Sequence, residues 1–105
     1  MLLAFNTNSM KAALINHEKV TDALGNTVEI KIWKLPAKTK DIPHGYKYSL
    51  AYIVGGRRVI GYDNHEGKGD HAHYLSKEKL YRFTDVDKLV RDFIADIKRY
   101  SGGIK

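Results

Sequence analysis

The sequence predicts an α+β domain in which an antiparallel meander of four to five strands packs against a C-terminal α-helix. Three patterns predict this fold. They are a clean alternation of apolar and polar residues in VEIKIWKL, two further strand-like segments joined by Gly55-Gly56, and an apolar stripe with helical spacing over about 85–100. A sheet covered on one face by a helix buries both apolar surfaces.

Two strand patterns lie in the first third of the chain. Residues 10–20, MKAALINHEKV, alternate loosely and are followed by TDALGNT, which is rich in turn-forming residues. Residues 28–35, VEIKIWKL, place Val28, Ile30 and Ile32 on one side of a strand, and Pro36 then removes a backbone donor. A loop at the edge of the sheet is expected over residues 37–45.

The segments YKYSLAYIV and RRVIGYDN predict a hairpin, because the intervening Gly-Gly pair can adopt the positive φ angles of a tight turn. If Val54 pairs with Arg57 and the register continues without interruption, Tyr48 lies opposite Asp63 and shares a sheet face with it. A slip of one residue would instead move Asp63 to the face of Ser49.

Apolar residues recur at spacings of three and four from Val86 to Tyr100, which indicates a helix with one apolar stripe. Thr84 followed by Asp87 has the pattern of a capping box at its start, and Gly102-Gly103 marks its end. The Lys and Arg residues of this segment alternate with Asp85, Asp92 and Asp96, which indicates a solvated helix face rather than a binding stripe.

Composition favours one globular domain with an anionic partner. The 105 residues suffice for one modest core, and 18 Lys and Arg against 12 Asp and Glu give a net charge of +6. Residues 1–60 carry nine basic and four acidic side chains, so the positive field belongs mainly to this half. We expect residues 1–9 to form a disordered or extra N-terminal extension, and residues 10–105 to form the domain.

Cysteine is absent, which excludes disulfides and thiolate zinc sites and fits a cytoplasmic location. No segment has the pattern of a secretion signal or a membrane span, so no membrane partner is expected. The GxxxxGK[ST] motif of nucleotide-binding loops is also absent, so the sequence gives no reason to expect ATP or GTP as a cofactor.

The segment GYDNHEGKGDHAHY, residues 61–74, is dense in groups that titrate or bind metal. One interpretation is a divalent metal site. His71 and His73 are two residues apart and point the same way on a strand, and His65, Asp63 or Asp70 would complete the ligand set.

A second interpretation is cleavage of RNA by acid-base catalysis without metal. Histidines suit both proton transfers at neutral pH, and Lys68, Arg57 and Arg58 would hold the phosphate. Gly67 and Gly69 flank Lys68 and let backbone amides approach an anion. A third interpretation is a solvated loop without activity, since Asp, Asn, Gly and Lys are ordinary turn formers.

Aromatic residues outside this segment allow two roles. Tyr46, Tyr48 and Tyr52 are expected in the core under the helix rather than stacked on bases. Trp33 fits equally well as a nucleic-acid contact and as a half-buried aromatic near an edge. His17 and His44 are interpreted as incidental.

The runs MKAALINHEKV, VEIKIWKLP, HGYKYSLAYIVGGRRVIGYDNHEGKGDHAHY, YRF and VDKLVRDFIADI resemble the TumE family, the toxin-side proteins of bacterial toxin-antitoxin gene pairs. The likeness extends from about Met10 to Tyr100. Its most specific part is GYDN followed by GKGDH and a further histidine two residues on. The resemblance implies a small toxin that inhibits growth when free and is neutralised by a DNA-binding antitoxin of the winged-helix or helix-turn-helix kind.

The family pattern carries over motif positions in this segment: Tyr62, Asp63, His65, Lys68, Asp70, His71 and His73. Because the family varies after YDN, the resemblance favours His71 and His73 over His65. Together with the chemistry above, it predicts the toxin of a type II toxin-antitoxin system that acts as a metal-independent, cofactor-free endoribonuclease. Homo- and hetero-oligomers both stay open.

In this prediction, His71 and His73 are acid and base, Asp63 or Asp70 orients one imidazole, and RNA is bound by Lys68, Arg57, Arg58, Lys47 and Tyr62. Two alternatives stay open: a non-catalytic RNA- or protein-binding module that inhibits translation, and a metal-dependent nuclease that uses His71 and His73.

Overall fold

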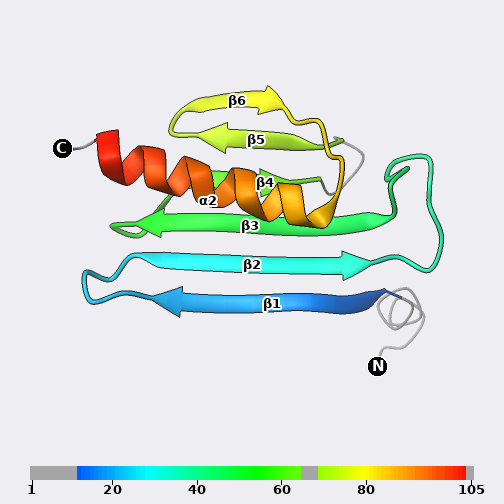
Figure 1. Cartoon of the computed structure of the whole chain (residues 1–105), viewed down its shortest axis with the longest axis horizontal. Coiled ribbons are helices and arrows are strands. Elements are labelled where there is room, and N and C mark those ends of the chain that lie inside the picture. Colours follow the sequence, from blue (N-terminus) through cyan, green and yellow to red (C-terminus); the bar gives the residue numbers. More distant parts are fainter. Residues whose placement is uncertain (1–11, 65–68, 104–105) are drawn as a thin grey trace.

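The computed structural model describes residues 12–64 and 69–103. Its strands form a six-stranded antiparallel meander in which each strand pairs with its neighbours in the sequence (Figure 1). The elements are β1 (Ala13–Thr21), β2 (Thr27–Lys34), β3 (Tyr46–Val54), β4 (Arg57–Asp63), β5 (His71–Tyr74), β6 (Lys77–Leu80) and α2 (Val86–Gly103). The predicted α+β fold with a C-terminal helix is confirmed, with one strand more than the upper number expected. The expected N-terminal extension, residues 1–9, lies outside the described residues.

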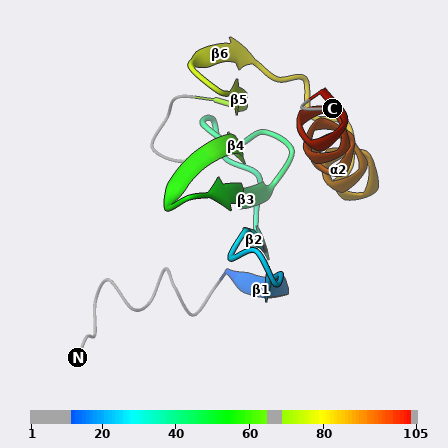
Figure 2. The same cartoon turned by 90° about the vertical axis from the view of Figure 1, so that its left-hand side faces the viewer.

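The helix lies on one side of the sheet, and the described residues place no other element on the opposite side (Figure 2). We call this opposite side the open face. Strand pairing and side-chain alternation assign to it Lys31, Trp33, Lys47, Ser49, Ala51, Arg58, Gly61, Asp63, His71, His73 and Glu78.

The core fills the space between the sheet and α2. Leu89 and Phe93 of the helix have no exposed surface. Against them lie the alternating inward residues of the central strands: Ile30, Ile32, Tyr48, Leu50, Tyr52, Ile60, Tyr62 and Ala72. Tyr46, Tyr48 and Tyr52 therefore belong to the helix side of the sheet, as the sequence predicted.

Two tyrosine hydroxyls join the sheet side to α2. Tyr62 donates to Asp96 at 2.6 Å and Tyr81 donates to Asp92 at 2.5 Å, while Lys88 Nζ lies 2.7 Å from the same Asp92 oxygen. Burial, and then these hydrogen bonds, raises the pKa of both phenols, so both remain donors at neutral pH. The basic residues of the predicted solvated face, among them Arg91 and Lys98, are exposed. Asp92 and Asp96, with 31% and 19% of their side chains exposed, also hold the tyrosines to α2.

The N-cap of α2 lies one residue later than the sequence predicted. Asp85 Oδ1 accepts the backbone N–H of Lys88 at 2.7 Å, and the Asp85 carbonyl accepts that of Leu89 at 3.0 Å. Asp85, rather than Thr84, is thus the N-cap. Gly102 and Gly103 lie in the last helical turn, close to the predicted end.

The additional strand is β6, a short strand of sequence KEKL in which all four residues are exposed. Its only described strand partner is β5, with which it pairs from His71 opposite Leu80 to Tyr74 opposite Lys77. The turn between them holds Leu75 at a φ of 58°. The sequence did not predict this strand, because a strand without a buried face need not show alternating apolar and polar residues.

The β3-β4 hairpin differs from its predicted register. Val54 pairs with Arg57, and Gly55 and Gly56 have φ angles of 60° and 77°, as expected for the turn. A β-bulge at Val59 then shifts the register, so that Ser49 lies opposite Asp63. The prediction that Asp63 shares the face of Tyr48 is therefore wrong.

Burial explains the shift. Without the bulge, Gly61 and Asp63 would face α2. With it, Ile60 and Tyr62 take those places in the core, and the carboxylate turns to the open face.

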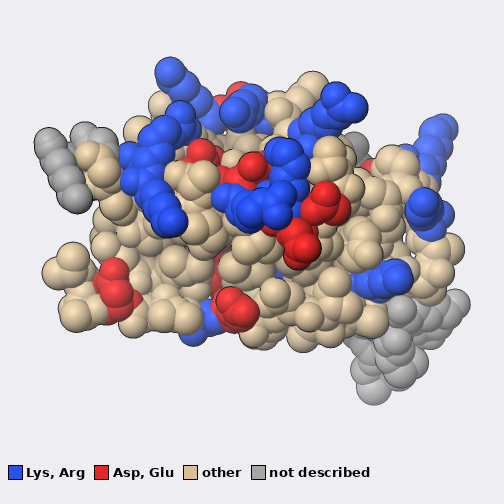
Figure 3. Space-filling model, viewed as in Figure 1, with Lys and Arg blue, Asp and Glu red and all other residues tan. Residues whose placement is uncertain are grey.

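Side chains of both signs lie on the helix side of the molecule, with carboxylates interspersed among the Lys and Arg side chains over α2 (Figure 3). No helix within residues 12–64 and 69–103 is both long and apolar enough to cross a membrane.

We expect Phe93→Ala to lower the free energy of unfolding by about 3–5 kcal/mol, because the ring is fully buried and its removal leaves a cavity. Urea unfolding measures the change. Leu80→Ala is the control, since Leu80 is 84% exposed and should change stability by less than about 0.5 kcal/mol. Equal losses in the two variants would contradict this core.

Asp92→Asn tests the interface under α2. Burial opposes ionisation, but hydrogen bonds from Lys88 and Tyr81 outweigh it and lower the pKa of Asp92. A carboxyl whose pKa is lower in the folded state stabilises the fold above its unfolded pKa, about 4, and loses that contribution as the pH falls through the folded value. The difference in unfolding free energy between parent and variant should shrink below about pH 4. A difference independent of pH would contradict the assignment.

Candidate functional site

Three neighbouring strands bring a polar cluster together on the open face. In the sheet register, Asp63 of β4 lies opposite His71 of β5, and His73 of β5 lies between Gly61 of β4 and Glu78 of β6. Because β4 carries its bulge before these positions, all of these side chains emerge on the side away from α2. We call Arg58, Asp63, His71, His73 and Glu78 the open-face cluster.

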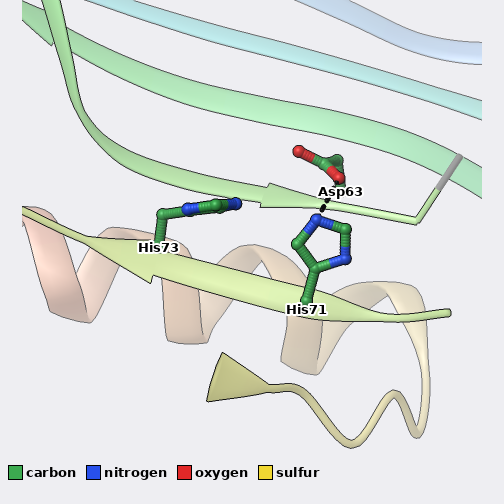
Figure 4. Close-up of side chains that lie close together, drawn as sticks. All are labelled: Asp63, His71 and His73. Carbon is green, nitrogen blue, oxygen red and sulfur yellow. Dashed lines mark ion pairs between the residues drawn. The ribbon is translucent and has the colours of Figure 1, made fainter. Parts of the chain in front are cut away.

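A buried ion pair forms the base of this cluster. His71 Nε2 lies 2.8 Å from Asp63 Oδ1, and both side chains are almost fully buried (Figure 4). The other ring nitrogen, Nδ1, lies 3.0 Å from the carbonyl oxygen of Gly69. A carbonyl and a carboxylate only accept hydrogen bonds, so this geometry is satisfied when both nitrogens of His71 carry a hydrogen.

His73 is the more accessible histidine of the pair, with 27% of its side chain exposed. Its ring centre lies 5.2 Å from that of His71, and the two planes are inclined at 72°. Glu78 Oε2 lies 3.7 Å from Nε2 of each histidine. One carboxylate thus faces both imidazoles from the β6 side.

Arg58 approaches Asp63 from the other side. Its Nη1 lies 3.3 Å from Asp63 Oδ2, so Asp63 contacts a guanidinium and an imidazole at once. The Arg58 side chain runs over Gly61, where a Cβ would lie 2.7–2.8 Å from guanidinium atoms. This close approach depends on glycine, because a Cβ at this position would displace the end of the arginine side chain.

Asp70 belongs to a different group of side chains. His44 Nε2 lies 2.9 Å from Asp70 Oδ1, and the Tyr48 hydroxyl donates to the same oxygen at 2.6 Å. His44 Nδ1 accepts the N–H of Tyr46 at 3.1 Å, and its ring stacks on Phe83 with centres 3.9 Å apart. His44 is therefore not incidental. It ties the β2-β3 loop to the segments before β5 and α2.

This second group is structural. Burial, followed by the hydrogen bond to Asp70, raises the pKa of Tyr48, so its hydroxyl stays a donor. The donors and acceptors of His44 are matched as a neutral imidazole that carries its hydrogen on Nε2. Of the two carboxylates predicted to orient an active-site imidazole, Asp63 contacts His71 and Asp70 contacts His44.

The remaining predicted residues are dispersed. Lys47 lies on the open face beside Trp33. Arg57 pairs with Val54 next to the hairpin turn, away from the cluster, and Tyr62 points to α2 and donates to Asp96. His65 and Lys68 lie outside the described residues.

Sequence reasoning missed Glu78 and underrated His44. Glu78 becomes visible only through the pairing of β6 with β5, and β6 has no alternation to reveal it. His44 lies 26 positions before Asp70, its main partner, so local spacing carries no signal of their contact.

A divalent metal ion is chemically compatible with part of the cluster. One ligand atom from each of Asp63, His71 and His73 lies within 4.8 Å of the others. His71 Nδ1 facing a backbone carbonyl is also a common support for a metal-bound histidine. Against this, the Arg58 guanidinium already places a positive charge on Asp63.

Comparison with known proteins gives one match. The family model described as Toxin TumE matches residues 8–101. No curated protein and no solved structure matches the chain. Because the family match covers most of the sequence and includes every residue of the open-face cluster, this chain belongs to the TumE toxin family.

Proposed function

We propose that this toxin is an endoribonuclease that cleaves RNA by acid-base catalysis without metal, at the open-face cluster. The observation that carries the proposal is the accessible His73 beside the buried His71-Asp63 ion pair, with Arg58 at the same carboxylate. Membership of a toxin family gives the chain a toxin role and implies an antitoxin partner. The RNA target class and the catalytic roles are the proposal.

Cleavage of an RNA strand requires two proton transfers. The ribose 2′-oxygen loses its proton and bonds to the adjacent phosphorus, and the bond from phosphorus to the 5′-oxygen breaks as that oxygen gains a proton. His73 serves as the base, because it is the more accessible of the two histidines and lies beside the Glu78 carboxylate. His71 serves as the acid: the hydrogen that its Nε2 shares with Asp63 passes to the leaving 5′-oxygen, while Nδ1 keeps its hydrogen bond to the Gly69 carbonyl.

Besides the two proton transfers, cleavage requires stabilisation of the charge on the phosphate, and Arg58 supplies it. Negative charge on the phosphate oxygens grows in the transition state, and a fixed guanidinium stabilises it. Asp63 holds Arg58 and His71 next to each other, so both cations face the same bound phosphate. The net charge of +6 adds a long-range attraction for the polyanionic substrate.

The biological setting follows from this role. A toxin that cleaves RNA acts in the cytoplasm, and its antitoxin, by the family resemblance, is a DNA-binding protein of the winged-helix or helix-turn-helix kind. The antitoxin then neutralises the toxin by covering the open-face cluster or by blocking the approach of RNA.

A metal-dependent nuclease is the second candidate, favoured by the mutual proximity of ligand atoms from Asp63, His71 and His73. In that case the ion would be bound by these residues and would supply Lewis-acid activation of water or phosphate. Loss of cleavage in EDTA, with recovery on addition of one divalent metal, would identify this alternative. Tight RNA binding without cleavage in any metal would instead identify a binding module.

His73→Ala and His71→Ala should each lower RNA cleavage at least about a hundredfold, the usual lower range for a general acid or base, and the parent protein should cleave fully in EDTA. The measurement is the cleavage rate of labelled RNA by purified protein. Growth arrest on expression should disappear in parallel. His17→Ala is a matched control, because His17 also lies beside a glutamate, Glu29 at 3.7 Å, but on β1. Full activity of both cluster variants would remove the histidines from the mechanism.

Gly61→Ala should lower cleavage by about a hundredfold with little loss of stability, because the added Cβ displaces only the flexible end of Arg58. The loss should match that of Arg58→Ala, and the double variant should be no slower than Arg58→Ala alone. Gly102→Ala is the control, since its Cβ meets no atom within 4 Å. Additive losses in the double variant would show that Gly61 acts independently of Arg58.

A further inference from the structure

The open face continues from the cluster across β3 to β2. Between the cluster and β2 lie short side chains: Ser49 pairs with Asp63, and Ala51 pairs with Gly61. Across β3 from the cluster, Lys31 of β2 lies opposite Ser49 and Glu29 lies opposite Ala51. Trp33, two residues along β2 from Lys31, pairs with Lys47 of β3. The face therefore presents an aromatic ring and a lysine next to a stretch of low side chains that leads to the cluster.

We propose that Trp33 and Lys47 form a binding site for a nucleotide of single-stranded RNA outside the scissile step, with Trp33 stacking on the base and Lys47 contacting a phosphate. This inference rests on the proposed function and deepens it, because it assigns how the substrate strand lies on the sheet.

The position of Trp33 supports a ligand contact. Ile30 and Ile32 alternate with it and fill the core, so Trp33 is on the face that α2 does not cover. Its indole is half-buried rather than enclosed. An aromatic ring on an open sheet face is the usual platform for stacking unpaired bases, and stacking tolerates any base because each has a π face.

The charges around Trp33 favour a polyanion. Lys47 is exposed, and none of the ion pairs between described residues involves it. Lys31 on the same face lies 3.7 Å from Glu29 and keeps 39% of its side chain exposed. With Arg58 at the cluster, cations stand at both ends of the stretch of short side chains. A phosphate backbone crossing the strands would meet them in succession.

The distance between Trp33 and the two histidines determines which nucleotide of the strand Trp33 would bind. From β2 to β5 there are three strand spacings, about 14 Å. Trp33 is therefore too far from His71 and His73 to contact the nucleotides that flank the scissile phosphate. A substrate of two nucleotides would not reach it, whereas a longer strand would.

Trp33 is the only tryptophan of the chain, so its fluorescence reports this contact directly. In the full-length His73→Ala protein, which leaves RNA intact, an unstructured RNA of about twelve nucleotides, within the range of single-strand site sizes, should quench it. Trp33→Ala should weaken binding of the same labelled RNA about 5–150-fold, and Trp33→Phe should weaken it less. Trp33→Ala should leave the cleavage rate of a diribonucleotide unchanged.

Lys47→Ala tests the phosphate contact without disturbing the core. It should reduce the slope of log affinity against log salt by about 0.7, the value for one contact to a single strand. Lys98→Ala, an exposed lysine on α2, is the matched control and should leave the slope unchanged.

The results of these experiments distinguish a failure of the Trp33 site from a failure of the proposed RNA cleavage. Absent quenching with unchanged affinity of both Trp33 variants overturns the site even if the parent protein cleaves RNA. Quenching by RNA with a parent protein that never cleaves overturns the proposed chemistry and supports the site. A fluorescence change caused by the antitoxin and not by RNA overturns the site, because it assigns this face to a protein partner.

Discussion

Burial of Ile60 and Tyr62 beneath α2 is the constraint on which the rest of the structure depends. These two side chains occupy the core only because β4 carries an extra residue at Val59. With Ile60 and Tyr62 inward, alternation sends Gly61 and Asp63 outward. The same register then places His71 and His73 of β5 beside them. One apolar requirement therefore positions a polar cluster on the other side of the sheet.

Charge balance at Asp63 organises that cluster. The carboxylate is nearly fully buried and contacts both Arg58 and His71. A buried carboxylate is stable only with such partners, and each partner is in turn held in place by it. The Arg58 guanidinium and the His71 imidazole are thereby fixed on one carboxylate at the sheet surface, where Glu78 and His73 are more exposed. A rigidly held guanidinium beside an accessible histidine suits the proposed phosphate chemistry.

The helix side of the sheet carries the contacts that stabilise the fold, and the open face carries the residues of the proposed function. On the helix side, the polar groups of the tyrosines are matched: Tyr48 with Asp70, Tyr62 with Asp96, and Tyr81 with Asp92. They fix the helix and the loops. On the open face, Trp33 and Lys47 lie uncovered within the described residues, two residues along β2 and β3 from the positions that face Asp63. The proposed substrate strand would lie on this face.

The sequence by itself determined the α+β class, the hairpin turn at Gly55-Gly56, the helix stripe and the family, because alternation, turn residues and helical spacing are local patterns. It also singled out Asp63, His71 and His73. Only the tertiary structure decided that Asp63 and not Asp70 meets His71, that Glu78 joins them, and that Tyr62 points away. These relations depend on a bulge and on the pairing of β6, which arise from burial and strand partners distant in the chain and leave no local signal.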